Sequence, residues 1–350
     1  MNNLNIVSLF SGAGGLDLGF KKAGFNTVYA NEYDKTIWQT FENNFPYTQL
    51  DKRDVRNIKS DEIPDCIGVI GGPPCQSWSE AGCLRGINDL RGKLFFECIR
   101  IIKNKKPLFF VAENVSGILH ARNKEAFNSI LNSFEELGYR VQYKLLNAKD
   151  YNVPQDRQRV FIVGFLKNVD FQFPQQNKKH LSLKDAIFDL KDSAKAHNQK
   201  DLDTFNHEYY VAGFSTIFMS RNRVRNWNEQ SFTIQAGGRH IPLHPQAPKM
   251  EVVTQNKRIF KKESEYLYRR LSVRECARIQ TFPDEYEFVY SRVSDGYKMI
   301  GNAVPVEFGR RLAAQIMSDL KSVKITKPSR KKGTYKSFEE LIKQIGNLGR

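Results

Sequence analysis

The sequence predicts an α/β protein, in which a mostly parallel sheet is covered by helices on both faces and is joined to a smaller, mainly irregular or β domain. Three observations lead to this prediction. Short apolar runs alternate with amphipathic segments from residue 5 to residue 165. Short aromatic and β-branched runs, broken by Gly, Pro and Asn, follow over residues 204–262. An amphipathic pattern over residues 306–320 then returns the chain to helix.

The alternation in the first half places the elements one by one. Apolar runs predict strands at residues 5–10, 27–31, 54–55 (the end of a weak strand), 67–70, 108–112, 141–146 and 160–165. Amphipathic segments predict helices at residues 16–23, 34–45, 93–103, 124–137, 183–190, 272–282 and 306–320. We therefore expect a first domain of residues 1–170 and 295–321, a second domain with its hinge at 171–294, and a basic tail at 322–350.

A glycine-rich turn, Ser11-Gly12-Ala13-Gly14-Gly15, closes the first predicted strand. The second strand ends at Glu32, twenty residues after Gly12, where a carboxylate can accept hydrogen bonds from ribose hydroxyls. Asp17 stands where a dinucleotide-binding turn has its third glycine, which allows close packing beside a pyrophosphate. The pattern therefore favours a Rossmann-like domain for S-adenosylmethionine over one for NAD.

Composition narrows the class of protein and the kind of partner. The net charge of +16 favours a polyanion such as nucleic acid, although residues 321–350 hold nine cations and two acids and could serve solubility alone. No apolar run approaches the roughly 20 residues of a membrane helix, and no signal-peptide pattern opens the chain. The five cysteines are an odd number without a C-x-x-C pair, so we expect a cytoplasmic protein without disulfides or a metal site.

Reactive side chains follow three of the predicted strands. Cys75 lies in the stiff turn Gly71-Gly72-Pro73-Pro74-Cys75, Glu113 ends the strand at 108–112, and Arg157 and Arg159 precede the strand at 160–165. Cys75 is a candidate nucleophile, because a thiolate is the most reactive side chain near neutral pH. Taken singly, Cys75 also fits a small buried residue, Glu113 a helix cap, and the arginines surface charges.

Together, these motifs resemble the DNA cytosine-5 methyltransferases over residues 4 to about 320, in the order usual for that family. The matching stretches are Phe10-x-Gly12-x-Gly14-Gly15, Glu32, Pro74-Cys75-Gln76, Glu113-Asn114-Val115, Gln155-x-Arg157-x-Arg159, Arg274-Glu275-Cys276-Ala277-Arg278 and Gly301-Asn302-Ala303-Val304-Pro305. The resemblance implies that the Cys75 thiolate adds to carbon 6 of a cytosine that has left the duplex. Glu113 would then protonate ring nitrogen 3, Arg159 would hold the carbonyl oxygen at position 2, and Arg157 would support the Cys75 side of the pocket.

The same resemblance implies residues for the cofactor and for DNA. The positions expected to contact S-adenosylmethionine are Phe10, Gly12, Gly14, Glu32, Tyr33, Asp54, Val55, Pro74, Leu94 and Asn302. Among these, Glu32 would accept the ribose hydroxyls, Tyr33 would stack on adenine, and Asp54 would accept from the adenine amino group. The segment 77–93 would close on double-stranded DNA, with Arg85 and Arg91 at phosphates.

Choice of the DNA sequence is expected in the second domain. Arg221, Arg223 and Arg225 would share one face if their stretch is extended, and Arg239 follows two glycines. Arginine reads guanine in the major groove, although each of these residues could instead grip a phosphate. The run 220–225 together with residues 246–248 also resembles GGCC-specific type II modification methyltransferases.

Three other functions remain open from the sequence. A methyltransferase of the same build could act on tRNA, although a second domain with clustered arginines favours duplex DNA. A nicotinamide-dependent dehydrogenase is disfavoured by Asp17, and a DNA-binding regulator without catalysis is disfavoured by Cys75 and Glu113. We expect a monomer, which could treat the two strands of a palindrome in turn.

Overall fold

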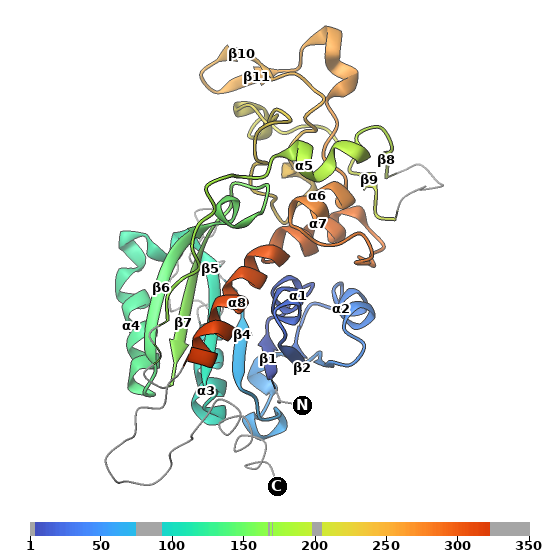
Figure 1. The fold of residues 1–350 in the computed structure, drawn as a ribbon. Helices are drawn as coiled ribbons and strands as arrows, with labels where there is room; N and C mark the ends of the chain where they lie inside the picture. The colour runs from blue at the N-terminus through green and yellow to red at the C-terminus, as the bar shows by residue number, and fades with distance from the viewer. Residues whose placement is uncertain (1–3, 75–92, 167–168, 170, 198–204, 323–350) are drawn as a thin grey trace, which may run out of the picture.

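A computed structural model of the chain describes residues 4–74, 93–166, 169, 171–197 and 205–322, and Figure 1 shows its fold. Seven strands form one sheet in the order β3-β2-β1-β4-β5-β7-β6. They are β1 (Asn5–Leu9), β2 (Asn26–Asn31), β3 (Gln49–Asp51), β4 (Gly68–Gly71), β5 (Phe109–Val115), β6 (Arg140–Asn147) and β7 (Gln158–Phe165). Strand β7 runs antiparallel to both β5 and β6, while β1 to β5 are parallel, which confirms a mostly parallel sheet.

Helices cover both faces of this sheet (Figure 1). They are α1 (Gly15–Lys22), α2 (Trp38–Asn44), α3 (Lys93–Lys105), α4 (Lys124–Glu136) and, from the end of the chain, α8 (Val306–Ser322). Helices α1 and α8 pack on one face, where Phe20 and Phe308 join Ile6 and Phe109 of the strands. Helices α3 and α4 pack on the other face, against Val7, Val69 and Phe110. Neighbouring strand residues therefore point to opposite layers, as the pleat of a strand requires.

A second domain extends from one end of the sheet (Figure 1). Its elements are α5 (Leu183–Ile187), β8 (Lys195–Ala196), β9 (Glu208–Tyr209), β10 (Glu251–Thr254), β11 (Lys257–Ile259) and α6 (Val273–Ile279). Helix α7 (Val293–Asn302) then leads back to α8 and the sheet. The short strands and connecting loops agree with a domain that is mainly irregular or β.

Several boundaries differ from prediction, and three of them have a clear local reason. The helix expected at 34–45 begins only at Trp38, because the Asp34 carboxylate accepts from the Thr36 amide and hydroxyl and holds the chain in a turn. The strand expected at 54–55 ends at Asp51 instead, and Asp54 caps a short 3-10 helix, Val55–Asn57. Helix α6 starts after Ser272, whose side chain forms a capping box with Glu275.

Within the described ranges, no helix is both long enough and apolar enough to cross a membrane. The same residues contain no group of three or more His, Cys, Asp or Glu side chains placed to hold a metal ion.

Candidate active site

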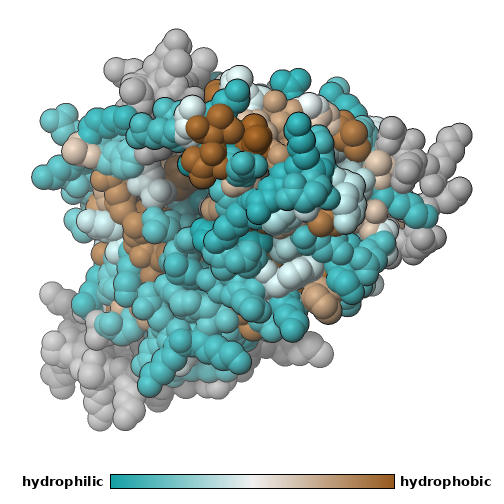
Figure 2. All heavy atoms as spheres, turned by 90° about the horizontal axis from the view of Figure 1, so that it is seen from above, coloured by the Kyte–Doolittle hydropathy of each residue, from teal (hydrophilic) through white to brown (hydrophobic). Residues whose placement is uncertain are grey.

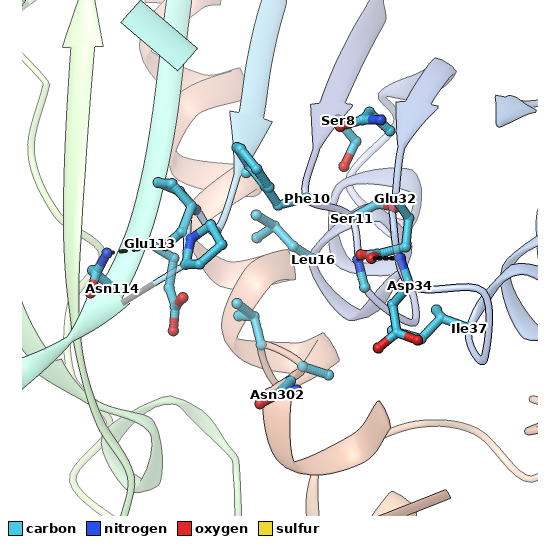
Figure 3. Close-up of a pocket in the computed structure, with 18 of the residues that line it drawn as sticks. Ser8, Phe10, Ser11, Leu16, Glu32, Asp34, Ile37, Glu113, Asn114 and Asn302 are labelled. Carbon is cyan, nitrogen blue, oxygen red and sulfur yellow. Dashed lines mark hydrogen bonds between the residues drawn. The ribbon is translucent and has the colours of Figure 1, made fainter. Parts of the chain in front are cut away.

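A cavity of about 500 Å³ opens at the carboxyl edge of the sheet, where the strand order reverses between β1 and β4 (Figure 3). Ligands of open α/β sheets bind at this switch point, because the loops after the two strands diverge there. The cavity is lined by twelve of the residues that the sequence singled out: Phe10, Gly12, Glu32, Tyr33, Asp54, Val55, Pro74, Leu94, Glu113, Arg157, Arg159 and Asn302. Residues from eight segments of the chain therefore meet at one site.

The glycine-rich turn and Glu32 form one wall of the cavity (Figure 3). Gly12 has a φ of 54°, and a side chain at this position would meet no atom within 4 Å, so the turn leaves open space beside its backbone. One Glu32 carboxylate oxygen accepts from the Gly12 amide (2.9 Å) and the other from the Asp34 amide (2.7 Å). Burial raises the pKa of Glu32 above its usual range. Each oxygen keeps a free lone pair for a ligand hydroxyl.

Gly14, which the sequence placed among the residues expected to contact a cofactor, does not line this cavity. It stands at φ 71°, immediately before α1, and a Cβ there would come within 2.3 Å of the Phe45 ring. Glycine is therefore required at this position by the backbone conformation and by packing against Phe45, the residue that follows α2.

At the other end of that wall lie Tyr33, Asp54, Val55 and Leu94. The Tyr33 ring is 70% exposed and is free to stack on a flat ligand. The Asp54 carboxylate accepts from Arg56 Nε (2.9 Å) and Nη2 (2.6 Å), and these contacts with Arg56 lower its pKa. Asp54 is thus held ionised, as an acceptor, at the rim of the cavity.

Glu113 and Arg159 form an ion pair on the opposite wall, with 2.9 Å between Arg159 Nε and Glu113 Oε1. Both side chains are nearly buried, at 11% and 13% exposure. Glu113 lies on β5, and its carboxylate is next to the turn that follows β4, because a Cβ on Gly72 would lie 3.3 Å from Glu113 Oε2. Asn114 Nδ2 donates to the Pro73 carbonyl (3.3 Å), so this turn is tied to the end of β5. A carboxyl and a guanidinium fixed side by side can orient a planar, hydrogen-bonding ring.

Cys75, the expected nucleophile, lies outside the described residues. Pro74, its neighbour in the chain, lines the same cavity as Glu113 and Arg159. Arg85 and Arg91 also lie outside the described residues.

Arg157 occupies a different setting from Arg159, although both line the cavity. Its side chain is 1% exposed, and its guanidinium donates to the carbonyls of Ile234 (3.1 Å), Gly301 (2.9 Å) and Ala303 (3.0 Å). Arg157 therefore joins the start of β7 to the second domain and to the last turn of α7. These contacts hold both neighbours of Asn302, whose side chain lines the cavity (Figure 3).

The sequence did not single out one ion pair at the cavity. Lys298 of α7 pairs with Asp34, and both side chains line the cavity. Lys298 lies four residues before Asn302, but its partner is far away in the sequence, so no local signal indicated the pair. The pair joins α7 to the segment that follows β2.

A second cavity of about 350 Å³ shares Arg159 with the first and is lined by Ser116, Asp156, Gln158, Phe232 and Thr233. Thr233 Oγ1 donates to the Asp156 carbonyl (2.6 Å), which fixes the second domain to the start of β7. Arg159 therefore stands between the first cavity and the junction of the two domains.

The arginines of the second domain do not share one face as expected. Arg221 and Arg239 are exposed, but Arg223 is 9% exposed and donates to the carbonyls of Phe218 (2.9 Å) and Ile217 (3.0 Å). Arg225 is half-buried, pairs with Glu229 (3.2 Å) and lies over the Phe232 ring, 4.1 Å from its centroid. The alternation fails because the stretch is irregular rather than extended.

Comparison with known proteins gives a consistent result. A family model described as C-5 cytosine-specific DNA methylase matches residues 4–318. The Type II methyltransferase M.FnuDI of Fusobacterium nucleatum is 55% identical over 344 residues, covering 95% of this chain and 100% of that protein. The Type II methyltransferase M.NgoPII of Neisseria gonorrhoeae is 54% identical over 330 residues, covering 91% and 97%. Among solved structures, a DNA modification methyltransferase encoded within a prophage of E. coli aligns with a TM-score of 0.70 and 23% identity, over 90% of this chain and 99% of that one, a likeness of fold.

Proposed function

The chain belongs to the family of C-5 cytosine-specific DNA methylases, and from this we propose that it methylates a cytosine flipped out of duplex DNA, within the sequence GGCC, with S-adenosylmethionine as methyl donor. The observation that carries the proposal is the Glu113–Arg159 pair, which faces the cavity beside residues 72–74, the residues that precede Cys75 in the chain. As in the relatives named type II methyltransferases, we propose that the activity serves modification in a restriction-modification system.

We assign the domains on the same basis. Residues 1–170 and 295–321 would form the catalytic domain, residues 171–294 would recognise the DNA target, and residues 322–350 would form a basic tail. The described part of this tail ends at residue 322. We propose that the protein acts as a monomer in the cytoplasm.

The cavity fits S-adenosylmethionine in size and in its donor set. Its volume of about 500 Å³ lies within the roughly 300–1,000 Å³ typical of small-molecule sites. Glu32 offers acceptors for ribose hydroxyls, Tyr33 an aromatic face for adenine and Asp54 an acceptor for its amino group. Phe10, Gly12, Pro74 and Asn302 would surround the methionine part. Bound S-adenosylmethionine would supply an electrophilic methyl group, on a sulfonium, to carbon 5 of the cytosine.

The protein's own groups would make carbon 5 able to accept that methyl group. The Cys75 thiolate would form a bond from sulfur to carbon 6, while the electrons of the C5–C6 double bond move towards carbon 5. Glu113 would give a proton to ring nitrogen 3, and Arg159 would hold the oxygen at position 2. After methylation, a water-derived base would take the carbon-5 proton as the bond between sulfur and carbon 6 breaks, and ring nitrogen 3 would return its proton to Glu113. These steps restore the aromatic ring, the thiolate and the carboxylic acid.

A cytosine inside a stacked duplex could not reach these groups, so it must rotate out at a cost of a few kcal/mol. The second cavity shares Arg159 with the first, and we propose that the cytosine enters there to reach the Glu113–Arg159 pair. We assign GGCC from the resemblance of residues 220–225 and 246–248 to GGCC-specific members. Arg221 and Arg239 are exposed and available to guanines, whereas Arg223 and Arg225 would have to leave their present contacts.

A methyl-transfer assay tests this proposal. Labelled S-adenosylmethionine is incubated with a duplex that carries one GGCC site, with a duplex of the same composition in scrambled order, and with a tRNA transcript. We expect label only in the GGCC duplex, on carbon 5 of one cytosine per strand. The Cys75→Ala variant should be inactive, and Cys66→Ala, which changes a buried cysteine outside the cavity, should stay active. Label in tRNA and not in DNA would show that the substrate is tRNA. Equal labelling of both duplexes would contradict the assignment of GGCC as the target sequence.

A further inference from the structure

The second domain ends in a two-stranded ribbon with little packing of its own. Strands β10 and β11 pair antiparallel, and every residue of β10 is exposed. The apolar side chains Val252, Val253 and Ile259 are 66%, 47% and 36% exposed. In Figure 1 this ribbon stands at the end of the second domain that is farthest from the sheet. Two strands with exposed apolar groups are marginal by themselves, so an exposed ribbon of this kind indicates a contact with a partner.

The charge of the ribbon identifies the chemistry of that partner. Residues 249–262 hold five cations, Lys249, Lys257, Arg258, Lys261 and Lys262, and one acid, Glu251. Arg258 has a partner within the ribbon, because its Nη1 donates to the Thr254 carbonyl (2.6 Å) across the turn between β10 and β11. Among the described residues, Lys257, Lys261 and Lys262 have no carboxylate within ion-pair distance. Figure 2, which looks onto this end of the molecule, shows hydrophilic side chains over most of the face, with apolar ones in several places between them.

A series of contacts leads from the candidate active site to the ribbon. Phe232 lines the cavity beside Arg159, and Arg225 lies over its ring. Arg223, two residues before Arg225, lies over the ring of Phe218, 4.8 Å from its centroid. The 3-10 helix that holds this phenylalanine, Phe218–Ser220, packs against β11. This series runs through the interior of the second domain, because Phe218 is 0% exposed and Arg223 is 9% exposed, and it connects the wall of the second cavity to the ribbon.

From this series of contacts and this charge, we propose that the β10–β11 ribbon binds the phosphates of duplex DNA that flanks the target site. The inference rests on the proposed function, which supplies duplex DNA as the substrate. A two-stranded ribbon fits the width of a DNA groove, and unpaired lysines at its edge release counterions from phosphates. This contact would be independent of base sequence, so it would add affinity for long DNA without changing which site is methylated.

Binding measured as a function of salt and of duplex length tests the proposal. The full-length protein and its K257Q/K261Q/K262Q variant are titrated with duplexes of about 12 and about 30 base pairs, each with one central GGCC, over a series of salt concentrations. The control variant K22Q/K59Q/K103Q removes three exposed lysines of the catalytic domain. For the long duplex, we expect the ribbon variant to lower the slope of log Kobs against log salt by about 2 to 3, at roughly 0.9 per phosphate contact. The control variant should keep the wild-type slope.

The two duplexes separate this proposal from the proposed function. If the ribbon binds flanking phosphates, the wild type gains affinity from the longer duplex and the ribbon variant loses that gain, while both methylate the short duplex. If the ribbon variant keeps the wild-type slope and gain while methylation continues, the ribbon proposal is overturned and the methyltransferase assignment stands. A dimer in sedimentation experiments that the ribbon variant abolishes would instead assign the ribbon to a second copy of the chain, and it would overturn the DNA contact.

Discussion

Asp17 allows a test of whether burial controls the ionisation of a carboxyl next to the glycine-rich turn. This carboxyl lies in the first turn of α1, just after the glycine-rich turn, and is 0% exposed. Thr27 Oγ1 donates to its Oδ1 (3.2 Å), while Oδ2 has no hydrogen-bond partner within the described part of the chain. Burial, only partly offset by hydrogen bonds from Ser8 and Thr27, raises the pKa of Asp17 to about 6.

The size and sign of the effect follow from that pKa. A rise from 3.8 to about 6 makes ionisation of Asp17 cost about 3 kcal/mol more in the folded chain than in the unfolded chain. Because the folded pKa is the higher one, the stability that this group contributes is fully present below 3.8 and is lost as the pH rises through about 6. Of these 3 kcal/mol of stability, about half is lost between roughly pH 5 and pH 8.

The perturbation is Asp17→Asn, which keeps the size of the side chain and cannot ionise. The assay is urea unfolding of the variant and the wild type, followed by far-UV circular dichroism. We expect the free energy of unfolding of the variant, relative to the wild type, to rise by about 1.5 kcal/mol from about pH 5 to about pH 8. A difference that stays constant over this range, or that falls, would refute the argument that burial controls this carboxyl.

Other predictions follow from single contacts. Glu275→Gln should lower the free energy of unfolding by about 3–5 kcal/mol in urea titrations, because the fully buried Glu275 accepts two hydrogen bonds from Arg269 (2.7 and 2.8 Å). The Glu275 pKa is lowered despite burial, since Arg269 holds the charge, so the gap between wild type and this variant should shrink as the pH falls below the ordinary carboxyl range. Gly14→Ala should destabilise the fold by about 1–3 kcal/mol in thermal unfolding, because of its left-handed φ and the Phe45 ring. Arg159→Met should lower kcat on the order of 10²–10³-fold in a methyl-transfer assay, with little change in the Kd for cofactor. An equal loss in kcat and in cofactor affinity would contradict the assignment of Arg159 to the target cytosine.

The part of the site that was predictable from sequence is the part set by local chemistry. Gly and Pro end β1 and β4 abruptly, so Gly12 and Pro74 could be placed at strand ends without knowledge of the fold. The spacing from Gly12 to Glu32 corresponds to one helix and one strand, and the hydrogen bond between them (2.9 Å) follows from parallel pairing of β1 with β2.

What escaped prediction depends on contacts between distant segments. Arg157 and Arg159 are two residues apart, and only the family resemblance gave them different roles. In the structure, one is buried against backbone carbonyls of α7 and the second domain, while the other pairs with Glu113. Arg223 is turned inward by the carbonyls of Phe218 and Ile217, which no periodicity of the stretch reveals. The pair of Lys298 with Asp34 forms only because α7 returns to the sheet.

The most direct test of the account concerns the bond between Cys75 and cytosine. A GGCC duplex with 5-fluorocytosine at the target position lacks the removable proton, so the enzyme should stay attached to the DNA once methyl transfer has occurred. Intact mass spectrometry should show a one-to-one adduct that carries one methyl group and maps to the Cys75 peptide, and Cys75→Ala should give none. An active enzyme that forms no such adduct, or one that is attached through another residue, would contradict the mechanism.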